Sequence, residues 1–426
     1  MRMKRNWAAA LSLALLFSLT LSLPALAHGR GNSGGRSYQT PSFGNLNAPK
    51  NLKIASKTGD TVQLTWSAVQ RAKGYEVYRN GVKVATVAKP VYTDNGLAQN
   101  TAYSYTVKTL DSANRVSKAT ASVGVTTQIV ITGEVTWTAE GGPYTVGGGL
   151  VVPEGASLHI EPGVVVKIKP GESIFVYGFL NAMGDEDNRV VFTSTKDKAY
   201  GGCGVRSSCD YWKTILVAPG ATFSGDYVKI VYGDVLATVK GMLTLTNSEA
   251  AYSRTLGIQV ESTGEFNGTF MNIHDCCEAT QCRGIVTKGV VNLSLSQITD
   301  CPGIGVLVEK TGSFNSTNNV IRGSERGVEV RGVANLVLTQ ITGCKYGLYF
   351  DTLSENGVIL NALMGNNCYG IYNKRSNDIT IQAVSNYWGS PNGPAVYDAA
   401  ARQWVGDGDR VSTGVNYADW LAEPAN

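Results

Sequence analysis

The sequence predicts an exported all-β protein in which a small antiparallel β-sandwich precedes a right-handed parallel β-helix. Three observations support this prediction: a leader-like N-terminus, about seven short alternating segments in one stretch of the chain, and a glycine-marked repeat further on. Glycine is also frequent, with 49 residues among 426, which is typical of turn-rich β proteins. We divide the chain into a signal peptide (1–27), a flexible linker (28–47), a sandwich (48–127), a β-helix (128–385) and a C-terminal cap (386–426).

Residues 1–27 have the three parts of a secretory signal peptide. Basic residues at positions 2, 4 and 5 precede an apolar run from Trp7 to Leu23, and Ala25-Leu26-Ala27 matches the small-x-small cleavage pattern. The run could persist as an anchor, but Pro24 and the cleavage pattern favour removal. No other segment reaches the roughly 18 consecutive apolar residues of a membrane span. We therefore expect a secreted, extracellular or cell-surface protein with no membrane span after cleavage.

The charge balance argues against nucleic acid as a partner. The formal net charge of +4 falls to +1 when the three basic residues of the leader are removed. A near-neutral chain lacks the basic surface that binds phosphate backbones.

Residues 48–127 alternate between apolar and polar side chains, as in Val62-Gln-Leu-Thr-Trp66, and turn signals such as Asn80-Gly81 separate the alternating segments. The segment resembles a fibronectin type III domain at Pro49, Leu52, Trp66, Tyr75, Asn80-Gly81, Leu97 and Thr101-Ala-Tyr103. The resemblance implies that Tyr103 forms the tyrosine corner of that family. It also implies a spacer or a weak binding platform in a secreted protein. The preceding residues 28–47 are rich in Gly, Ser and Asn, which predicts a flexible linker.

The β-helix region repeats with a period of 20 to 27 residues. A glycine before an alternating segment recurs at intervals of 27, 21, 22, 20 and 23 residues, at Gly257, Gly284, Gly305, Gly327, Gly347 and Gly370. The positions one and three residues after each glycine are mostly apolar, so we predict that they point inward in stacked parallel strands. A second strand of each repeat contains Ile273, Ile298, Ile321, Ile341 and Leu363.

Two polar columns accompany the second strand. The first consists of Asn267, Asn292, Asn315 and Asn335. Stacked coils lie about 4.8 Å apart, so these amides can hydrogen-bond along the axis as an asparagine ladder. The first three asparagines also begin Asn-x-Ser/Thr sequences, which we interpret as structural rather than as glycosylation sites.

The second column contains Cys276, Cys301 and Cys344. Only cysteines of neighbouring coils could be bridged, because two coils exceed the roughly 7 Å that a disulfide tolerates. We expect free thiols in this column. Elsewhere we predict two loop disulfides, Cys203–Cys209 and Cys277–Cys282. The alternative is that all eight cysteines are reduced.

The outward position four residues after each glycine alternates in charge. The six residues are Glu261, Lys288, Glu309, Arg331, Asp351 and Lys374. Neighbouring coils would pair them as a continuous charge ladder that fixes the register, with each contact worth about 0.2–1 kcal/mol.

The segment from Leu150 to Ile168 and the closing segment from Asn386 to Pro394 resemble bacterial right-handed β-helix proteins of the pectin-lyase-like fold. The resemblance covers about residues 129–425, and it implies the fold but not one function. Lyases, hydrolases, adhesins and proteins without known activity share this fold. Trp388, Trp404 and Trp420 of the closing segment are expected to cover the open end of the last coil.

A catalytic site is not evident in the sequence. The polygalacturonase motifs Asp-Asp and Gly-His-Gly are absent. His28 lies in the linker, His159 is expected to point outward from a strand, and His274 could suggest a metal ligand but lies beside the cysteine column, which favours a structural role. Calcium binding would need carboxylates without basic partners. Glu309, Glu329 and Asp351 have basic neighbours, so we expect no cofactor, with calcium only for a lyase.

Tyr349 and Tyr372 are expected to lie side by side on the outer surface, where a flat aromatic platform could stack on a sugar ring. The alternative is ordinary packing between neighbouring strands. The favoured function is a non-catalytic scaffold that binds an extracellular polysaccharide or a cell-surface component. The alternative is a polysaccharide lyase or glycoside hydrolase whose site is built on the loop from Lys196 to Lys213, with Lys198, Arg206 and Asp210.

Overall fold

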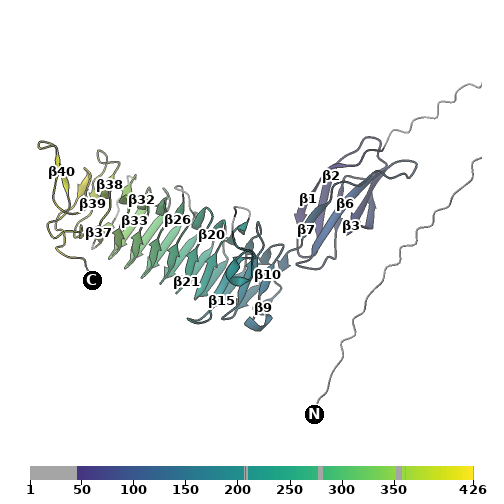
Figure 1. Ribbon diagram of the computed structural model, residues 1–426, viewed down its shortest axis with the longest axis horizontal. Coiled ribbons are helices and arrows are strands. Elements are labelled where there is room, and N and C mark those ends of the chain that lie inside the picture. Colours follow the sequence, from purple (N-terminus) through teal and green to yellow (C-terminus); the bar gives the residue numbers. More distant parts are fainter. Residues whose placement is uncertain are drawn as a thin grey trace, which may run out of the picture. The chain divides into compact units, whose positions relative to one another are not determined.

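A computed structural model describes residues 46–205, 207, 210–276, 282–351, 357–359 and 361–425. The predicted signal peptide and all but the last two residues of the predicted linker lie outside these ranges. The described part is almost entirely β-structure (Figure 1). Its two helical segments are single 3-10 turns, Ala139–Gly141 (η1) and Lys198–Tyr200 (η2). No helix among the described residues is long and apolar enough to span a membrane.

The N-terminal region is an antiparallel sandwich of two sheets, as predicted. One sheet has the order β1-β2-β5, with β1 Lys50–Lys57, β2 Val62–Ser67 and β5 Val91–Asp94. The other has the order β4-β3-β6-β7, with β4 Val82–Val87, β3 Gly74–Arg79, β6 Ala102–Leu110 and β7 Val123–Thr126. Alternation places Val62, Leu64 and Trp66 in the core between the sheets. The Tyr103 hydroxyl accepts a hydrogen bond from the Ala98 N–H at 3.0 Å, which is the geometry of a tyrosine corner.

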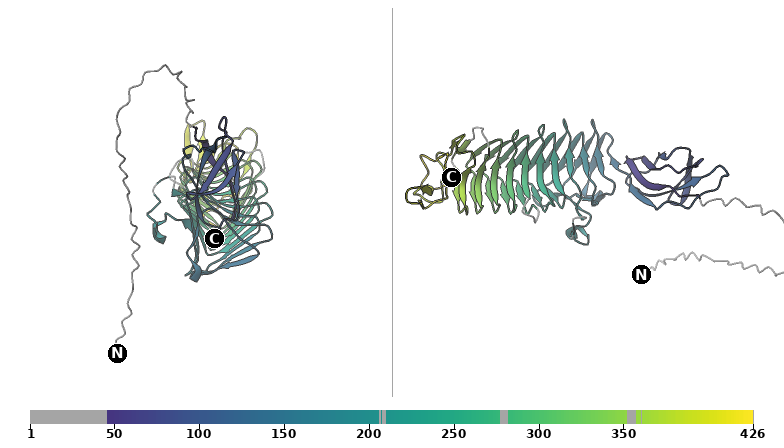
Figure 2. Two further views of the ribbon diagram at one scale, coloured as in Figure 1. Left: turned by 90° about the vertical axis from the view of Figure 1, so that its right-hand side faces the viewer. Right: turned by 90° about the horizontal axis from the view of Figure 1, so that it is seen from above.

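The remaining strands form a parallel β-solenoid, so the predicted architecture is confirmed. Three parallel sheets run along it, and successive strands of the chain visit sheets 1, 2 and 3 in turn (Figures 1 and 2). Sheet 1 contains β8 Ile129–Val130, β11 Leu150–Val152, β14 Ile174–Val176, β17 Ile215–Val217, β20 Val235–Val239, β23 Leu256–Val260, β26 Arg283–Thr287, β29 Ile304–Val308, β32 Arg326–Val330, β35 Tyr346–Phe350 and β38 Tyr369–Asn373.

The other two sheets complete each coil. Sheet 2 contains β9 Glu134–Trp137, β12 Ser157–Ile160, β15 Phe179–Met183, β18 Thr222–Asp226, β21 Met242–Thr246, β24 Glu265–Thr269, β27 Val290–Ser294, β30 Ser313–Thr317, β33 Val333–Val337 and β36 Gly357–Ile359. Sheet 3 contains β10 Tyr144–Val146, β13 Val165–Ile168, β16 Val190–Ser194, β19 Val228–Val231, β22 Glu249–Ala251, β25 Asn272–His274, β28 Gln297–Thr299, β31 Val320–Arg322, β34 Gln340–Thr342 and β37 Ala362–Met364.

The register of these sheets follows the predicted columns. Ile258 pairs with Ile285, and the same column continues through each later coil to Ile371. In sheet 3, Ile273 pairs with Ile298, and this column continues to Leu363. All of these side chains are buried in one continuous core.

The repeated glycines have a steric cause. A Cβ atom on Gly284 would lie 2.7 Å from the carbonyl oxygen of Gly305, and one on Gly305 would lie 2.6 Å from that of Gly327. No other residue fits at such a position without moving the neighbouring backbone. The glycine column therefore marks a place where adjacent coils approach each other closely.

The two ends of the solenoid are closed differently. At the N-terminal end, residues 129–146 form a regular first coil, in which Trp137 and Tyr144 stack with ring centroids 4.3 Å apart. At the other end, a cap contains β39 Ile381–Gln382, β40 Val396–Asp398, β41 Gln403–Val405 and β42 Val415–Asn416. Trp388 is fully buried in the core, as expected of a capping residue, whereas Trp420 is 43% exposed.

The cysteine column consists of free thiols, as expected. Cys276, Cys301 and Cys344 are buried, and each thiol donates to a main-chain carbonyl of its own coil. For the two predicted disulfides, Cys209 and Cys277 lie outside the described residues. Cys203 is exposed and is not bridged to any described cysteine, and Cys282 is buried. Both pairings stay predictions.

We predict that Phe314→Ala destabilises the solenoid by about 3–5 kcal/mol, because Phe314 is fully buried between Val291 and Ala334 of the adjacent coils and its removal leaves a cavity. Guanidinium unfolding followed by tryptophan fluorescence measures the loss. The control is Phe270→Asn, because Phe270 is 52% exposed in a left-handed turn where asparagine is favourable. Its effect should stay within about 0.5 kcal/mol. A similar loss for both variants would contradict this description of the core.

Candidate functional site

Four tyrosines form a patch on the outer face of sheet 1 at its C-terminal end. Tyr346 and Tyr349 lie on β35, and they pair in register with Tyr369 and Tyr372 on β38. We call these four residues the tyrosine patch. All four side chains are half-buried. The two predicted platform residues are therefore neighbours, but two further rings surround them.

The rings of the patch contact one another and the cap. The Tyr349 and Tyr372 centroids are 5.1 Å apart with planes tilted by 32°, and Tyr346 stacks on Tyr369 at 6.1 Å with nearly parallel planes. Trp404 of β41 packs edge-on against Tyr369 at 5.7 Å. The patch is thus continuous with the cap, which the sequence had assigned to covering the core.

A buried carboxylate and an arginine fix the edge of the patch. The Arg326 guanidinium lies 4.2 Å from the Tyr349 ring centroid and also bonds to Glu329, whose side chain is only 2% exposed. Burial raises the pKa values of Tyr349 and Tyr369. These phenols therefore stay protonated at neutral pH, and they offer hydrogen-bond donors and apolar faces rather than a base.

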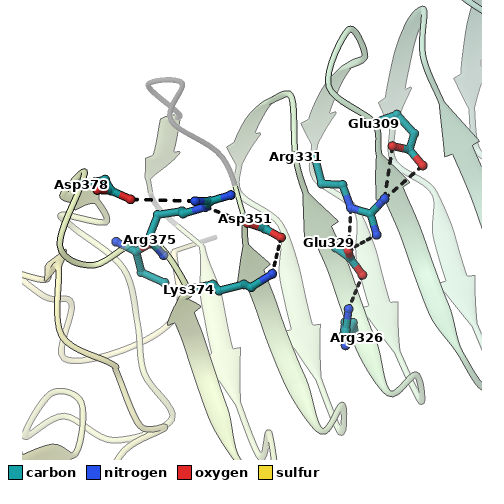
Figure 3. A network of polar contacts seen from close by, with 9 residues as sticks. Glu309, Arg326, Glu329, Arg331, Asp351, Lys374, Arg375 and Asp378 are labelled. Carbon is teal, nitrogen blue, oxygen red and sulfur yellow. Dashed lines mark hydrogen bonds and ion pairs between the residues drawn. The ribbon is translucent and has the colours of Figure 1, made fainter.

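The predicted charge column forms separate pairs. Lys288 contacts Glu261 at 3.0 Å, Arg331 contacts Glu309 at 3.3 Å, and Lys374 contacts Asp351 at 2.7 Å (Figure 3 draws the latter two). Among the described residues, no ion pair joins Lys288 to Glu309 or Arg331 to Asp351. The expectation of a continuous ladder is therefore wrong.

The reason is geometric. Each cation turns toward the preceding coil, and Arg331 also binds Glu329 while Asp351 also binds Arg375. Glu261, Glu309, Glu329 and Asp351 thus each have a basic partner. These four carboxylates are therefore not the unpartnered ligands that calcium requires.

A cavity of about 570 Å³ lies between the last coil and the cap, next to the tyrosine patch. It is lined by Tyr369, Tyr372, Asn373, Lys374, Ser376, Val396, Tyr397, Ala399, Trp404, Val411, Ser412, Thr413, Gly414, Val415 and Tyr417. Buried Asn373 fixes one wall, because its side-chain amide donates to the carbonyls of Ile379 and Gly414. The volume lies within the usual range for small-ligand sites.

The four predicted ladder asparagines hydrogen-bond along the axis of sheet 2. Asn292 donates to Asn267 at 2.7 Å, Asn315 donates to Asn292 at 2.7 Å, and Asn335 donates to Asn315 at 3.0 Å. Their amides are thus used between coils.

A second set of asparagines, which the sequence reasoning missed, lies buried in the turns between sheets 2 and 3. Asn319 accepts from the Ser296 N–H, and Asn361 accepts from the Thr339 N–H. These side chains satisfy main-chain groups that the turns leave unpaired.

A polar cluster missed by the sequence analysis lies on sheet 3, where side chains of three successive coils meet. Glu249 contacts Lys229 at 2.8 Å and the Nε2 of His274 at 3.5 Å, and the Nδ1 of His274 contacts Asp275 at 2.8 Å. The hydrogen bond to Glu249 raises the pKa of His274. Burial acts to raise the pKa of Glu249, but hydrogen bonds from His274 and Lys229 outweigh it and lower the pKa to about 2.

The remaining predicted candidates do not converge on a site. Asp210 accepts hydrogen bonds from Ser207 within its own loop, Lys198 lies in η2, and Arg206 is outside the described residues. His159 points outward from β12 toward Glu134 at 3.3 Å, as expected. His28 is also outside the described residues.

A sequence signal for the complete patch existed. The positions immediately before the repeat glycines form a column in sheet 1, which runs Leu256, Arg283, Ile304, Arg326, Tyr346 and Tyr369. Inspecting this column would have added Tyr346 and Tyr369. The contact between Tyr369 and Trp404 had no such signal, because it depends on how the cap folds back.

Comparison with known families supports the sandwich assignment. The fibronectin type III profile matches residues 47–124, where the structure has the sandwich and its tyrosine corner. Residues 47–124 form a fibronectin type III domain. This domain agrees with the predicted segment 48–127.

Relatives with known names share only short stretches with this chain. Chitinase C of Streptomyces lividans is 47% identical over 83 residues, which are 19% of this chain and 13% of the relative. Exoglucanase B of Cellulomonas fimi is 39% identical over 103 residues, 23% of this chain and 9% of the relative. Poly(3-hydroxybutyrate) depolymerase of Ralstonia pickettii is 42% identical over 85 residues, 20% and 17% respectively. The chain therefore spans less than a fifth of the length of these relatives.

A small part of the chain is also similar to a solved structure. An Fn3-like protein from Clostridium thermocellum is 30% identical and covers 18% of this chain and 86% of its own, with a TM-score of 0.17.

The solenoid matches a further family. Residues 191–397, slightly less than half of the chain, match the profile described as periplasmic copper-binding protein (NosD). The described residues contain no group of three or more His, Cys, Asp or Glu side chains that could hold a metal ion. Burial raises the pKa of Cys344, so this core thiol stays protonated.

We predict that His274→Gln destabilises the protein most between about pH 4.5 and 6.5, by about 1–2 kcal/mol. Since the folded pKa of His274 is raised, its contribution is complete below the unfolded value and is lost as pH rises through the folded value. Since the folded pKa of Glu249 is lowered, its contribution is complete above the unfolded value and is lost as pH falls toward about 2.

Urea unfolding of both proteins at about pH 5.5 and about pH 9 tests this prediction. His159→Gln, on sheet 2, is the matched control and should show little dependence on pH. An equal loss at both pH values for His274→Gln would show that ring packing against Tyr252, and not charge, stabilises the cluster.

Proposed function

We propose that this protein is a non-catalytic extracellular or periplasmic scaffold that binds polysaccharide through its tyrosine patch. The tyrosine patch is the observation that supports this proposal. It places aromatic ring faces and protonated phenol groups side by side on two strands that pair in register. Sugar rings present C–H faces that stack on aromatic rings and hydroxyl groups that need polar partners.

Two further observations support a glycan as the partner. The similar stretches in a chitinase and an exoglucanase indicate that this kind of domain accompanies proteins named for polysaccharide substrates. In addition, the neighbouring acids Glu309, Glu329 and Asp351 are each paired with a base, which favours binding over acid-base catalysis by these residues.

We expect the double variant Tyr349→Ala and Tyr372→Ala to weaken binding to a matched polysaccharide by about tenfold, since each lost aromatic contact is worth about 0.5–1.5 kcal/mol. Affinity electrophoresis across a panel of neutral and acidic polysaccharides measures the change. Tyr349→Phe with Tyr372→Phe keeps the rings and should retain most of the binding. Tyr177→Ala is the matched control, because Tyr177 is 46% exposed beyond β14 and far along the sheet from the patch. Unchanged retention of the double alanine variant on every bound polysaccharide would refute the proposal.

The second candidate is a polysaccharide lyase or hydrolase centred on Lys229, Glu249 and His274. The meeting of these ionisable side chains from three coils is the observation that favours it. Against it, both ring nitrogens of His274 already contact carboxylates, and Glu249 with a pKa of about 2 is a weak base.

Incubating the purified protein with uronic-acid and neutral polysaccharides, with and without calcium, distinguishes the two functions. The scaffold proposal expects neither unsaturated uronate ends nor new reducing ends. Product formation that Glu249→Gln abolishes, with the fold retained by circular dichroism, would establish the enzyme instead.

A further inference from the structure

We propose that the cavity between the last coil and the cap binds an anionic sugar unit, and that Arg410 selects it. This inference rests on the proposed function, because the cavity shares Tyr369 and Tyr372 with the tyrosine patch. A glycan that stacks on the tyrosine patch can therefore extend into the cavity and contact aromatic side chains along the whole path.

The walls of the cavity are mainly aromatic, with five aromatic side chains among the lining residues. The charged lining residue, Lys374, is paired with Asp351 at 2.7 Å, so its charge is already compensated. None of the lining residues is acidic. An amino sugar would therefore find no carboxylate among the lining residues to pair with.

Arg410 is not a lining residue, but it places a positive charge beside the cavity, against one of its lining residues. Its guanidinium carbon lies 4.9 Å from the ring centroid of Trp404, a lining residue. Its carbonyl oxygen accepts the N–H of Gly370 at 2.9 Å, which anchors the residue beside the end of β38. The side chain is exposed, and among the described residues no acidic group forms an ion pair with it.

Three acids of the cap have other partners. Asp398 accepts the N–H groups of Ala400 and Ala401, and Asp409 is buried against Asn366. Asp407 accepts from the Asn392 amide. Arg410 therefore has no ion-pair partner among the described residues, and it lies against the Trp404 ring. A planar guanidinium in this state suits bidentate binding of a carboxylate or a sulfate.

The test compares three probes by isothermal titration calorimetry: oligogalacturonides, sulfated galactan oligosaccharides and cello-oligosaccharides. We expect the protein to bind an anionic probe more tightly than the neutral one. In Arg410→Gln the ratio of the two affinities should fall by about tenfold. Arg410→Lys keeps the charge but not the planar fork, so it should restore only part of the preference. Trp404→Ala should weaken anionic and neutral probes alike if the neutral probe also enters the cavity.

The outcomes separate the two proposals. If Arg410→Gln loses the preference over the neutral probe only for oligogalacturonides, or only for sulfated probes, the result supports the inference and identifies the anion as a carboxylate or a sulfate. An unchanged preference in Arg410→Gln, with binding still reduced by Tyr349→Ala and Tyr372→Ala, overturns the inference and leaves the patch intact. Absence of binding for every probe and polysaccharide overturns both. Circular dichroism confirms the fold of each variant, and Arg410 is exposed, so its replacement should not unfold the cap.

Discussion

The close approach of neighbouring coils at the repeat glycines is the constraint on which the solenoid depends. A Cβ atom at Gly257, Gly284 or Gly305 would lie within 2.3–2.7 Å of a carbonyl oxygen of the next coil. Only glycine permits this contact, so the position cannot slip by a residue without a clash. Every other column is then fixed relative to the glycines. The apolar residues stack inside, and the asparagines, charges and tyrosines stack at constant places on the outer faces.

This register explains why most polar residues of the chain are structural. In-register strands bring like positions about 4.8 Å apart, so amides can bond to amides and acids to bases. Asn292 is used by its neighbours above and below, and Glu329 is buried between Arg326 and Arg331. Groups held in this way are poorly suited to transfer protons or to bind a metal. An aromatic surface remains available where the last coils meet the cap.

The cap has two roles that separate along its length. Trp388 enters the core and closes it, which removes apolar surface from water. Trp404 instead stands between Tyr369, Tyr397 and Arg410, where the chain returns to the edge of sheet 1. The cap thus closes the core of the solenoid, and together with the last coil it also forms a cavity next to the tyrosine patch. A regular solenoid presents similar faces along its axis, so its irregular end is a natural place for a specific site.

The sequence by itself determined the domain order, the coil register, the asparagine ladder and the neighbourhood of Tyr349 and Tyr372. It could do so because a parallel repeat places equivalent positions of each period side by side, so that spacing along the chain reports contact in space. Only the tertiary structure decided that the charge column divides into pairs, that Glu249 and His274 meet, and that Trp404 contacts both the tyrosine patch and Arg410. The direction in which a side chain points, and the path by which the cap folds back, do not repeat along the sequence. They follow from packing in three dimensions.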